Sequence, residues 1–237
     1  MATDSNKGDG RTVQLKRVRL SFTNRLKDKA TTSAESDKET HGCNFILEAD
    51  QPEFEANNAK VVGALKEAGL QAFKNEDAYK TIAEDAPKRV CYRKGEKWKN
   101  KEGKVYAGYE GNRAVTANGP SGGTKRPKLL DRRKRVLRDQ ATGEQIKANM
   151  VFGEGEILDI FYGGCYADVI LSFYGTDKGS RGIFCSIEAI RSHENGERMG
   201  GGIYVDADDF DNLEDDDTFD SGPSQSGKSS ESDDLLL

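Results

Sequence analysis

The segment GCYADVILSFY, Gly164 to Tyr174, alternates between two kinds of side chain and decides the fold class. One set of alternate positions is apolar and is expected to face a core: Cys165, Ala167, Val169, Leu171 and Phe173. The other set is expected on the opposite face: Tyr166, Asp168, Ile170, Ser172 and Tyr174. Because strand side chains point alternately to the two faces of a sheet, this period of two predicts a β-strand with a buried face.

A second alternating segment is Val13–Phe22, VQLKRVRLSF, in which apolar residues alternate with mostly basic ones. Its core face is expected to carry Val18, Leu20 and Phe22, and its opposite, cationic face to carry Arg17, Arg19 and Ser21. Further strands are predicted over Cys43–Glu48, Arg89–Lys94, Tyr106–Tyr109, Asn112–Asn118, the region of Val136, Glu156–Phe161 and Gly182–Arg191.

The segment Asp50–Gly69 changes to a helical period. Asp50 and Glu53 have capping-box spacing, and Gly69 suits the position that follows a helix. The apolar stripe between them consists of Phe54, Val61, Leu65 and Ala68. A shorter helix is predicted over Asp77–Glu84, ended by Pro87. Short strands with glycine-rich turns and one inserted helix favour a small barrel or sandwich.

Among these mainly β architectures we expect an OB-fold, a five-stranded Greek-key barrel with extra strands and one or two helices. Residues 11–205 are expected to form one domain. Residues 1–10 and 206–237 are polar and lack periodicity, so both are expected to be disordered. The longest apolar stretch is far shorter than the roughly 20 residues of a membrane span, which predicts a soluble, non-exported protein with no membrane association.

Charge is divided unevenly along the chain. Residues 206–237 carry twelve carboxylates and one lysine, a net charge of −11; since the whole chain carries −5, residues 1–205 carry +6. A basic body joined to an acidic tail indicates a surface for polyanions and a flexible competitor for that surface.

Cations and aromatic residues are interleaved between residues 88 and 147, a segment that contains eighteen Lys or Arg and only six Asp or Glu. The residues predicted from this pattern to bind nucleic acid are Tyr92, Arg93, Trp98, Tyr106, Tyr109, Arg113, Lys128, Arg132 and Arg133. Phosphates need cations, and unpaired bases need flat apolar surfaces on which to stack. A solvated loop surface with its tyrosines in a core is the alternative, but concentrated positive charge is destabilising without a polyanion or the acidic tail.

Catalysis is not expected. The stretch GPSQSGKS, Gly222 to Ser229, matches the phosphate-loop pattern, but it lies in a polar segment and not between a buried strand and a helix. Clustered carboxylates occur chiefly in the tail, where nothing would hold them in catalytic geometry. The four cysteines are dispersed among strand residues and are interpreted as reduced core residues rather than metal ligands. We expect no cofactor, no metal and no enzyme activity.

Five stretches together resemble a family of single-stranded-DNA-binding proteins from tailed bacteriophages, an OB-fold group with acidic C-terminal tails. They are VRLSF (Val18–Phe22), YAGYEGNRAVTAN (Tyr106–Asn118), IFYGGCYADVILSFY (Ile160–Tyr174), GIFCSIEAI (Gly182–Ile190) and NGERMGG (Asn195–Gly201). The resemblance spans about residues 12 to 210. It implies sequence-independent binding of single-stranded DNA in phage replication or recombination, in the cytoplasm of the infected host, and it leaves room for homo-oligomers.

The resemblance also implies roles for individual residues. Carried over by position, the DNA contacts are Arg17, Arg19, Tyr106, Tyr109, Arg113, Tyr162 and Tyr166. The tail is implied to contact phage or host replication proteins, and the residues expected to do so are Asp215, Asp216, Asp217, Asp233, Asp234, Leu235, Leu236 and Leu237. Two alternatives stay open: an RNA-binding or duplex-binding OB-fold module, and a mediator that anneals complementary strands.

Overall fold

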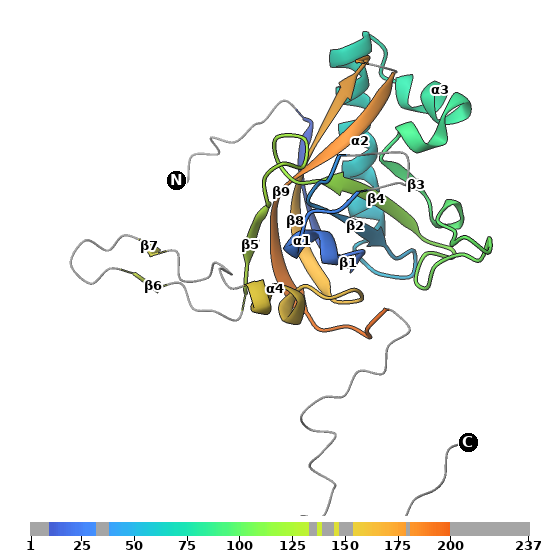
Figure 1. The fold of residues 1–237 in the computed structure, drawn as a ribbon. Coiled ribbons are helices and arrows are strands. Elements are labelled where there is room, and N and C mark those ends of the chain that lie inside the picture. The colour runs from blue at the N-terminus through green and yellow to red at the C-terminus, as the bar shows by residue number, and fades with distance from the viewer. Residues whose placement is uncertain are drawn as a thin grey trace, which may run out of the picture. The chain divides into compact units, whose positions relative to one another are not determined.

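The computed structural model describes residues 10–31, 38–132, 137–138, 145–146, 154–178 and 181–199. Its main sheet has seven strands in the order β3-β4-β2-β1-β8-β9-β5 (Figure 1). The strands are β1 (Thr12–Ser21), β2 (Gly42–Leu47), β3 (Tyr92–Lys94), β4 (Arg113–Asn118), β5 (Lys128–Leu130), β8 (Tyr166–Thr176) and β9 (Gly182–Glu194). β6 (Leu137–Arg138) and β7 (Gln145–Ile146) pair separately with each other.

Five of these strands close into a barrel. β1 pairs antiparallel with β2 and β8, β2 pairs with β4, and β8 pairs with β9. A parallel contact between β4 and β9, with Asn118 opposite Ser186, closes the ring. This is the five-stranded Greek-key barrel of an OB-fold, with β3 and β5 as the extra strands, so the predicted fold class is confirmed.

The long strands keep the predicted faces. Cys165, Ala167, Val169, Leu171 and Phe173 are all buried in the barrel core. Ile183, Cys185 and Ile187 of β9 meet them from the neighbouring strand. The four cysteines are buried and free, as predicted for core residues.

The end of the first strand departs from the prediction. Val18 and Leu20 are buried as expected, but Phe22 is 44% exposed and has a left-handed backbone with φ 55°. β1 ends at Ser21, so the alternation no longer fixes the direction of the next side chain. Ser21, predicted on the cationic face, is 7% exposed. Arg17 also has positive φ, 48°, where the pairing of β1 with β8 shifts register.

The long helix extends further than predicted. α2 spans Phe54–Phe73 and packs on the barrel through Val61, Leu65 and Ala68. The expected capping box is not formed, because the N-cap is Glu53 and makes no side-chain cap hydrogen bond. Gly69 lies inside the helix, where a Cβ would stand 2.7 Å from the Asn75 carbonyl oxygen. A glycine at this position lets the chain turn closely past the helix instead of ending it.

Three other helices complete the fold. α3 spans Ala78–Asp85, close to the predicted range, and a 3₁₀ turn follows at Pro87–Arg89. α1 spans Asn24–Lys27, and α4 spans Glu154–Ile160. The strand predicted over Glu156–Phe161 is therefore wrong. Ile157, Ile160 and Phe161 are buried together, and this i, i+3, i+4 spacing is that of a helix face.

The strand predicted over Tyr106–Tyr109 is also wrong, since these residues form turns. Gly108 and Gly111 have φ of 77° and 74°, a conformation that glycine adopts at low cost and that does not continue a strand. Val136, residues 1–9 and the acidic segment 206–237 lie outside the described residues, and β6 begins at Leu137, one residue after Val136. No helix in the described part of the chain is long and apolar enough to cross a membrane.

Candidate nucleic-acid interface

Two arginines of β1 lie against Tyr166 of β8. The Arg17 guanidinium lies over the Tyr166 ring, 4.2 Å from its centroid, and Arg17 Nη2 is 2.6 Å from Glu194 Oε1. Arg19 Nη1 is 3.0 Å from Glu48 Oε1. The Tyr166 hydroxyl donates to Glu48 Oε2 at 2.8 Å. The family resemblance implied Arg17, Arg19 and Tyr166 as DNA contacts, but the sequence did not show that two carboxylates neutralise both arginines.

Burial and these carboxylates shift the pKa values of the group. Burial alone would lower the pKa of Arg17, but the hydrogen bond and charge of Glu194 outweigh it and raise the pKa. Burial raises the pKa of Tyr166, and its hydrogen bond to Glu48 raises it further. At neutral pH Arg17 is therefore a cation and Tyr166 a neutral ring with a hydroxyl to donate.

An exposed aromatic pair lies beside this group. Phe22 and Tyr106 meet edge to face with ring centroids 5.1 Å apart, and they are 44% and 38% exposed. Together with Met199 and neighbouring backbone they line a hollow of about 320 Å³. Large exposed rings around a hollow are unusual in a folded protein and are typical of binding surfaces. Phe22 was not among the predicted site residues, because the alternation of β1 placed it in the core.

Two of the aromatic residues predicted to bind nucleic acid, Tyr109 and Trp98, pack against neighbouring side chains next to the Phe22–Tyr106 pair. Tyr109 is fully buried, and its hydroxyl accepts a hydrogen bond from Asn44 Nδ2 at 2.9 Å. Burial raises the pKa of Tyr109 to about 12. The Arg93 guanidinium lies over the Trp98 ring, 4.0 Å from its centroid, and the centroids of the Trp98 and Tyr109 rings are 5.5 Å apart. Tyr109 therefore presents no ring face for stacking, whereas Trp98 is partly exposed and has Arg93 over its ring.

The indole of Trp98 has one unsatisfied group. Its Nε1 is buried and has no hydrogen-bond partner among the described residues. A buried donor without an acceptor is destabilising by about 1 to 3 kcal/mol. A ligand oxygen reaching the edge of the ring would remove that penalty.

Tyr162 belongs to the same end of the barrel. Arg198 lies over its ring at 4.0 Å from the centroid, and the Tyr162 hydroxyl donates to the Gly196 carbonyl at 3.0 Å. Arg19 links the loop at Gly164 to the loop at Glu197, because its guanidinium donates to the Gly164 carbonyl at 3.3 Å and to the Glu197 carbonyl at 3.0 Å. Arg198, like Phe22, escaped sequence prediction, since the cationic side chain comes from a segment without local charge excess.

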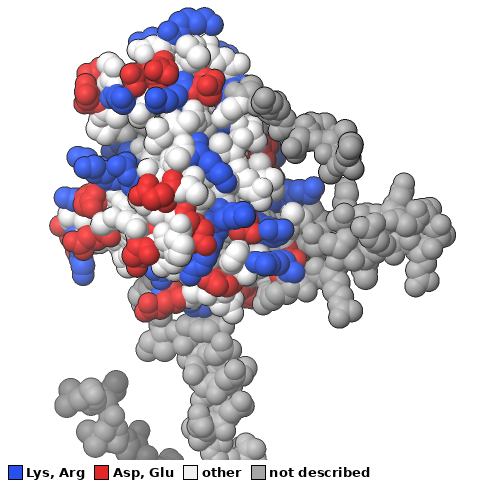
Figure 2. All heavy atoms as spheres, turned by 180° about the vertical axis from the view of Figure 1, so that it is seen from behind, with Lys and Arg blue, Asp and Glu red and all other residues white. Residues whose placement is uncertain are grey.

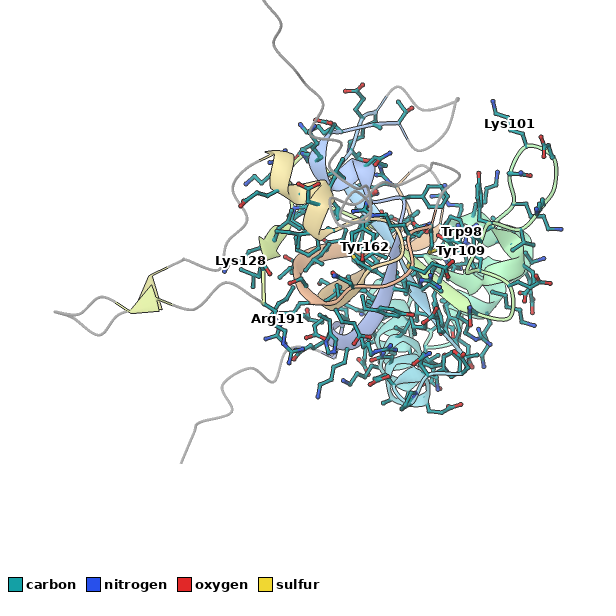
Figure 3. The ribbon with its side chains drawn as sticks, turned by 90° about the horizontal axis from the view of Figure 1, so that it is seen from below. Trp98, Lys101, Tyr109, Lys128, Tyr162 and Arg191 are labelled. Carbon is teal, nitrogen blue, oxygen red and sulfur yellow. The ribbon has the colours of Figure 1, made fainter. Side chains whose placement is uncertain are left out.

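These residues form one continuous surface, which we call the aromatic strip. It consists of Arg17, Arg19, Phe22, Trp98, Tyr106, Tyr162, Tyr166, Arg198 and Met199. Arg19 and Met199 connect the parts of the strip, because both side chains lie against Gly108. A Cβ at Gly108 would be 2.7 Å from the Met199 methyl carbon and 3.7 Å from Arg19 Nη1. Figure 3 views the barrel from below and labels Trp98 and Tyr109 next to each other, with Tyr162 nearer the centre of the view.

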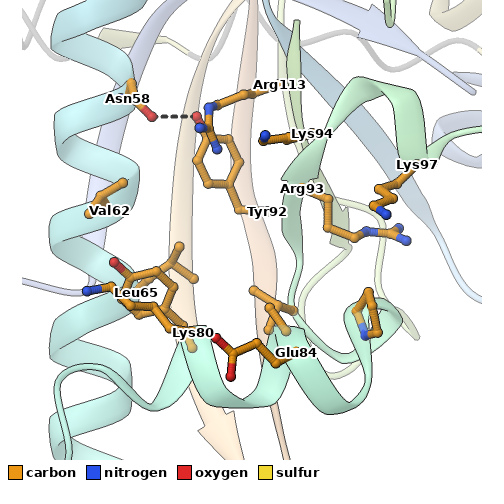
Figure 4. Close-up of a pocket in the computed structure, with 14 residues that line it drawn as sticks. Asn58, Val62, Leu65, Lys80, Glu84, Tyr92, Arg93, Lys94, Lys97 and Arg113 are labelled. Atoms are coloured by element: carbon orange, nitrogen blue, oxygen red, sulfur yellow. Dashed lines mark hydrogen bonds between the residues drawn. The ribbon is translucent and has the colours of Figure 1, made fainter.

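Other predicted contacts lie away from the strip. Tyr92, Arg93 and Arg113 line a cavity between α2, α3 and β3 (Figure 4), and the Arg93 guanidinium also lies over the Trp98 ring. Tyr92 is 8% exposed and its hydroxyl donates to Asn58 Oδ1 at 2.7 Å. Burial and this hydrogen bond leave Tyr92 no open ring face.

A second outlying group lies at β5. Lys128 is exposed, and Figure 3 shows it on the far side of Tyr162 from Trp98. The Arg132 backbone N–H donates to Ser192 Oγ at 2.8 Å, and Arg132 Nη1 is 3.3 Å from His193 Nδ1. Arg133 and the predicted tail contacts, Asp215 to Asp217 and Asp233 to Leu237, lie outside the described residues. The predicted contacts that the structure describes thus fall into three groups: one at the aromatic strip, one at the cavity between α2, α3 and β3, and one near β5.

The face of the molecule turned away from the viewer in Figure 1 carries side chains of both charges. Figure 2 shows basic and acidic side chains interspersed over the face seen from behind. Mixed charges of this kind do not concentrate polyanions.

Comparison with known proteins gives matches of sequence and of structure. Solved structures with the same fold include the single-stranded DNA-binding protein from bacteriophage Enc34 in complex with ssDNA, at a TM-score of 0.58 and 14% identity, covering 81% of this chain and 90% of that one. Its C-terminal truncation matches at a TM-score of 0.56 and 13% identity, covering 80% and 89%.

A curated relative, putative protein p50 of Acyrthosiphon pisum secondary endosymbiont phage 1, is 28% identical over 138 residues. That match spans 58% of this chain and 60% of the relative. The model of one family, described as Enterobacter phage Enc34, ssDNA-binding protein, matches residues 11–220. Since this covers most of the sequence, the chain belongs to the family of the Enterobacter phage Enc34 ssDNA-binding protein.

Proposed function

We propose that this protein binds single-stranded DNA without sequence preference, through the aromatic strip. The observation that carries the proposal is the exposed pair Phe22 and Tyr106 around a hollow, with arginines on the same surface. Every base has a π face, so stacking on such rings is tolerant of sequence and contributes about 1 to 3 kcal/mol per base. Membership of the Enc34 family supports the same ligand.

The arginines of the strip are expected to bind phosphates by exchange. Arg17 and Arg19 are held by Glu194 and Glu48 in the described structure. A phosphate that approaches either guanidinium replaces a carboxylate, so the net gain per contact is smaller than for a free cation. Arg198 over Tyr162 places a further cation beside a ring.

We assign the acidic segment 206–237 two roles. Its charge of −11 makes it a competitor of DNA for the basic body. Its end, SDDLLL, places three leucines behind a carboxylate pair, a pattern suited to a partner with an apolar pocket and a basic rim. The protein acts in phage DNA replication or recombination within the host cytoplasm, binding DNA and replication proteins without covalent chemistry.

Titration of the full chain with fluorescent oligo-dT, and with a duplex of equal length, tests the ligand directly. A stacking surface needs unpaired bases, so we expect at least about tenfold preference for the single strand. Incubation of labelled DNA with divalent metal ions is expected to leave its length unchanged. Equal affinity for duplex, or no retention of oligo-dT in dilute buffer, would refute the proposal.

A further inference from the structure

We propose that the cavity between α2, α3 and β3 is a docking site for an acidic peptide that carries leucine side chains. The cavity measures about 580 Å³, within the range of roughly 300 to 1,000 Å³ typical of ligand sites. Nothing in this proposal depends on DNA binding by the strip. It assigns a second surface of the same barrel to a protein ligand.

The floor of the cavity is aliphatic. Val62 and Leu65 contribute from α2, Ala83 from α3, and Pro87 and Val90 from the chain that follows (Figure 4). An aliphatic floor favours branched aliphatic side chains, because apolar area is removed from water without a directional requirement.

The rim of the cavity is cationic. Arg93, Lys94, Lys97 and Arg113 line it, and none of the four makes an ion pair within the described parts of the chain. The only carboxylate among the lining residues is Glu84. Arg93 and Arg113 lie over the Trp98 and Tyr92 rings, but without carboxylate partners the four positive groups around an apolar hollow favour a ligand with several negative charges.

Arg93 is the least satisfied of these cations. Its Nε is buried without a hydrogen-bond partner in the described structure, and desolvation by burial lowers its pKa. A carboxylate entering from the cavity side would supply both the charge and the missing acceptor, and such charge-assisted hydrogen bonds are the stronger kind.

The lining favours a peptide over a nucleic-acid strand. Stacking requires an exposed ring, but Tyr92 is 8% exposed with its hydroxyl bonded to Asn58. Tyr79 is partly buried and packs against the core. The site therefore offers leucine-sized apolar contacts and cations, without a platform for bases.

This chain encodes a segment of the required chemistry. Glu231–Leu237, ESDDLLL, has three carboxylates followed by three leucines. The assigned occupant is this segment, with its leucines on the floor formed by Val62 and Leu65 and its carboxylates at Arg93 and Lys94. In that role the cavity competes with partner proteins for the same leucines.

A labelled ESDDLLL peptide, titrated against the full chain with Leu235, Leu236 and Leu237 replaced by Ser, tests the assignment. The replacements remove the chain's own competitor. We expect saturable binding that Ala83→Trp, which fills the cavity, weakens at least about tenfold. Removing both exposed lysines with Lys94→Gln and Lys97→Gln should weaken binding about fivefold, and less at high salt.

The matched control removes the same charge elsewhere, with Lys101→Gln and Lys104→Gln in an exposed turn. It should leave peptide affinity within about twofold. The lysine pair keeps the test decisive even when Ala83→Trp perturbs folding, because Lys94 and Lys97 are exposed.

Three results of the peptide titrations overturn the proposal: equal binding of an ESDDSSS peptide, no effect of the cavity variants, or equal effects of the two lysine pairs. Oligo-dT titrations of the same variants separate this failure from failure of the proposed function. If the cavity variants weaken oligo-dT binding as much as peptide binding, the cavity is part of the path of the DNA strand and the peptide assignment is wrong.

Discussion

Phe22 and Tyr106 come from distant parts of the sequence, yet their rings meet edge to face at 5.1 Å and both remain exposed to solvent. The backbone of Phe22 is left-handed, a conformation that costs a residue with a Cβ about 1 to 2 kcal/mol. Strain of this kind clusters at functional sites, where the surrounding structure maintains it. The pair is therefore the part of the aromatic strip that folding alone does not explain.

Removing either ring should weaken DNA binding without unfolding the protein. We predict that Phe22→Ala and Tyr106→Ala each lower oligo-dT affinity about 5-fold to 100-fold, the equivalent of one lost stacking contact. Because both side chains are exposed, the free energy of unfolding should change little beyond the strain at Phe22. Fluorescence anisotropy and urea unfolding measure the two quantities.

Leu70→Ala on α2 is the matched control, since Leu70 is 48% exposed and lies outside the strip. It should leave DNA affinity unchanged. Normal oligo-dT binding by the double variant of Phe22 and Tyr106 would remove the strip as the binding surface.

Because the Phe22 backbone is left-handed, we predict that glycine at this position makes the protein more stable to unfolding than alanine does. Alanine normally stabilises a chain relative to glycine, but at φ 55° its Cβ is unfavourable. We expect Phe22→Gly to be about 1 kcal/mol more stable to unfolding than Phe22→Ala, while both bind DNA equally weakly. At Ile170, an exposed strand position, the same comparison should show the ordinary order.

The sequence predicted the barrel well where side-chain period alone determines the structure. β8 and β9 are long and half buried, and their alternation is unambiguous. Prediction failed at the end of β1, where Phe22 has a left-handed backbone, and over Glu154–Ile160, a helix whose apolar spacing also fits a short strand. Neither backbone angle nor local packing can be read from residue types.

The candidate site was predicted less completely than the fold. Alternation placed Arg17 and Arg19 correctly on one face, but their carboxylate partners, Glu194 at the end of β9 and Glu48 directly after β2, are brought to them only by folding. Interleaved cations and aromatics marked the region of Trp98, but burial of Tyr109 depends on packing in three dimensions. Residue type therefore indicated the chemistry, and tertiary contacts decided which rings are accessible.

Releasing Arg19 from its carboxylate should strengthen DNA binding. In Glu48→Gln the Tyr166 hydroxyl keeps an acceptor, but the Arg19 charge is no longer neutralised. We predict about twofold to fivefold tighter oligo-dT binding and a salt slope steeper by about 0.7, the value for one added single-strand phosphate contact. Asp177→Asn, at an exposed position after β8, should change neither the affinity nor the slope beyond the general effect of one charge.

Identical salt slopes for Glu48→Gln and the parent chain would show that Arg19 does not contact phosphate. The guanidinium would then serve only to join the loops of Gly164 and Glu197. Thermal unfolding of the variant checks that this junction stays intact.

Asp168 should make stability depend on acid pH. Burial alone would raise the pKa of its carboxyl, but hydrogen bonds from Arg191, the Arg17 N–H and His193 outweigh burial, so the pKa lies below its ordinary value. A depressed folded-state pKa gives stability that is present above the unfolded value, about 3.9, and lost as pH falls through the folded value.

We therefore expect Asp168→Asn to lower the free energy of unfolding by about 1 to 3 kcal/mol at pH 7 and by much less near pH 2. Urea unfolding at both pH values measures the difference. Asp177→Asn is again the control, because that side chain is exposed. A loss of equal size at both pH values would assign the effect to packing instead of charge.

Deleting the acidic segment 206–237 should change how DNA binding depends on salt. The segment carries −11 and the remaining chain +6, so intramolecular competition is strongest when ionic screening is weak. We predict that the shortened chain binds oligo-dT more tightly at low salt and loses affinity more steeply as salt rises, because DNA phosphates no longer replace carboxylates already bound. At high salt the DNA affinities of the two proteins should converge.

A matched variant keeps the length of the chain, with Asp215, Asp216 and Asp217 replaced by Asn. Its DNA affinity and salt dependence should lie between those of the parent chain and those of the deletion. Unchanged affinity at low salt in both proteins would show that the segment does not compete with DNA for the strip, and would leave the cavity and protein partners as its remaining binding sites.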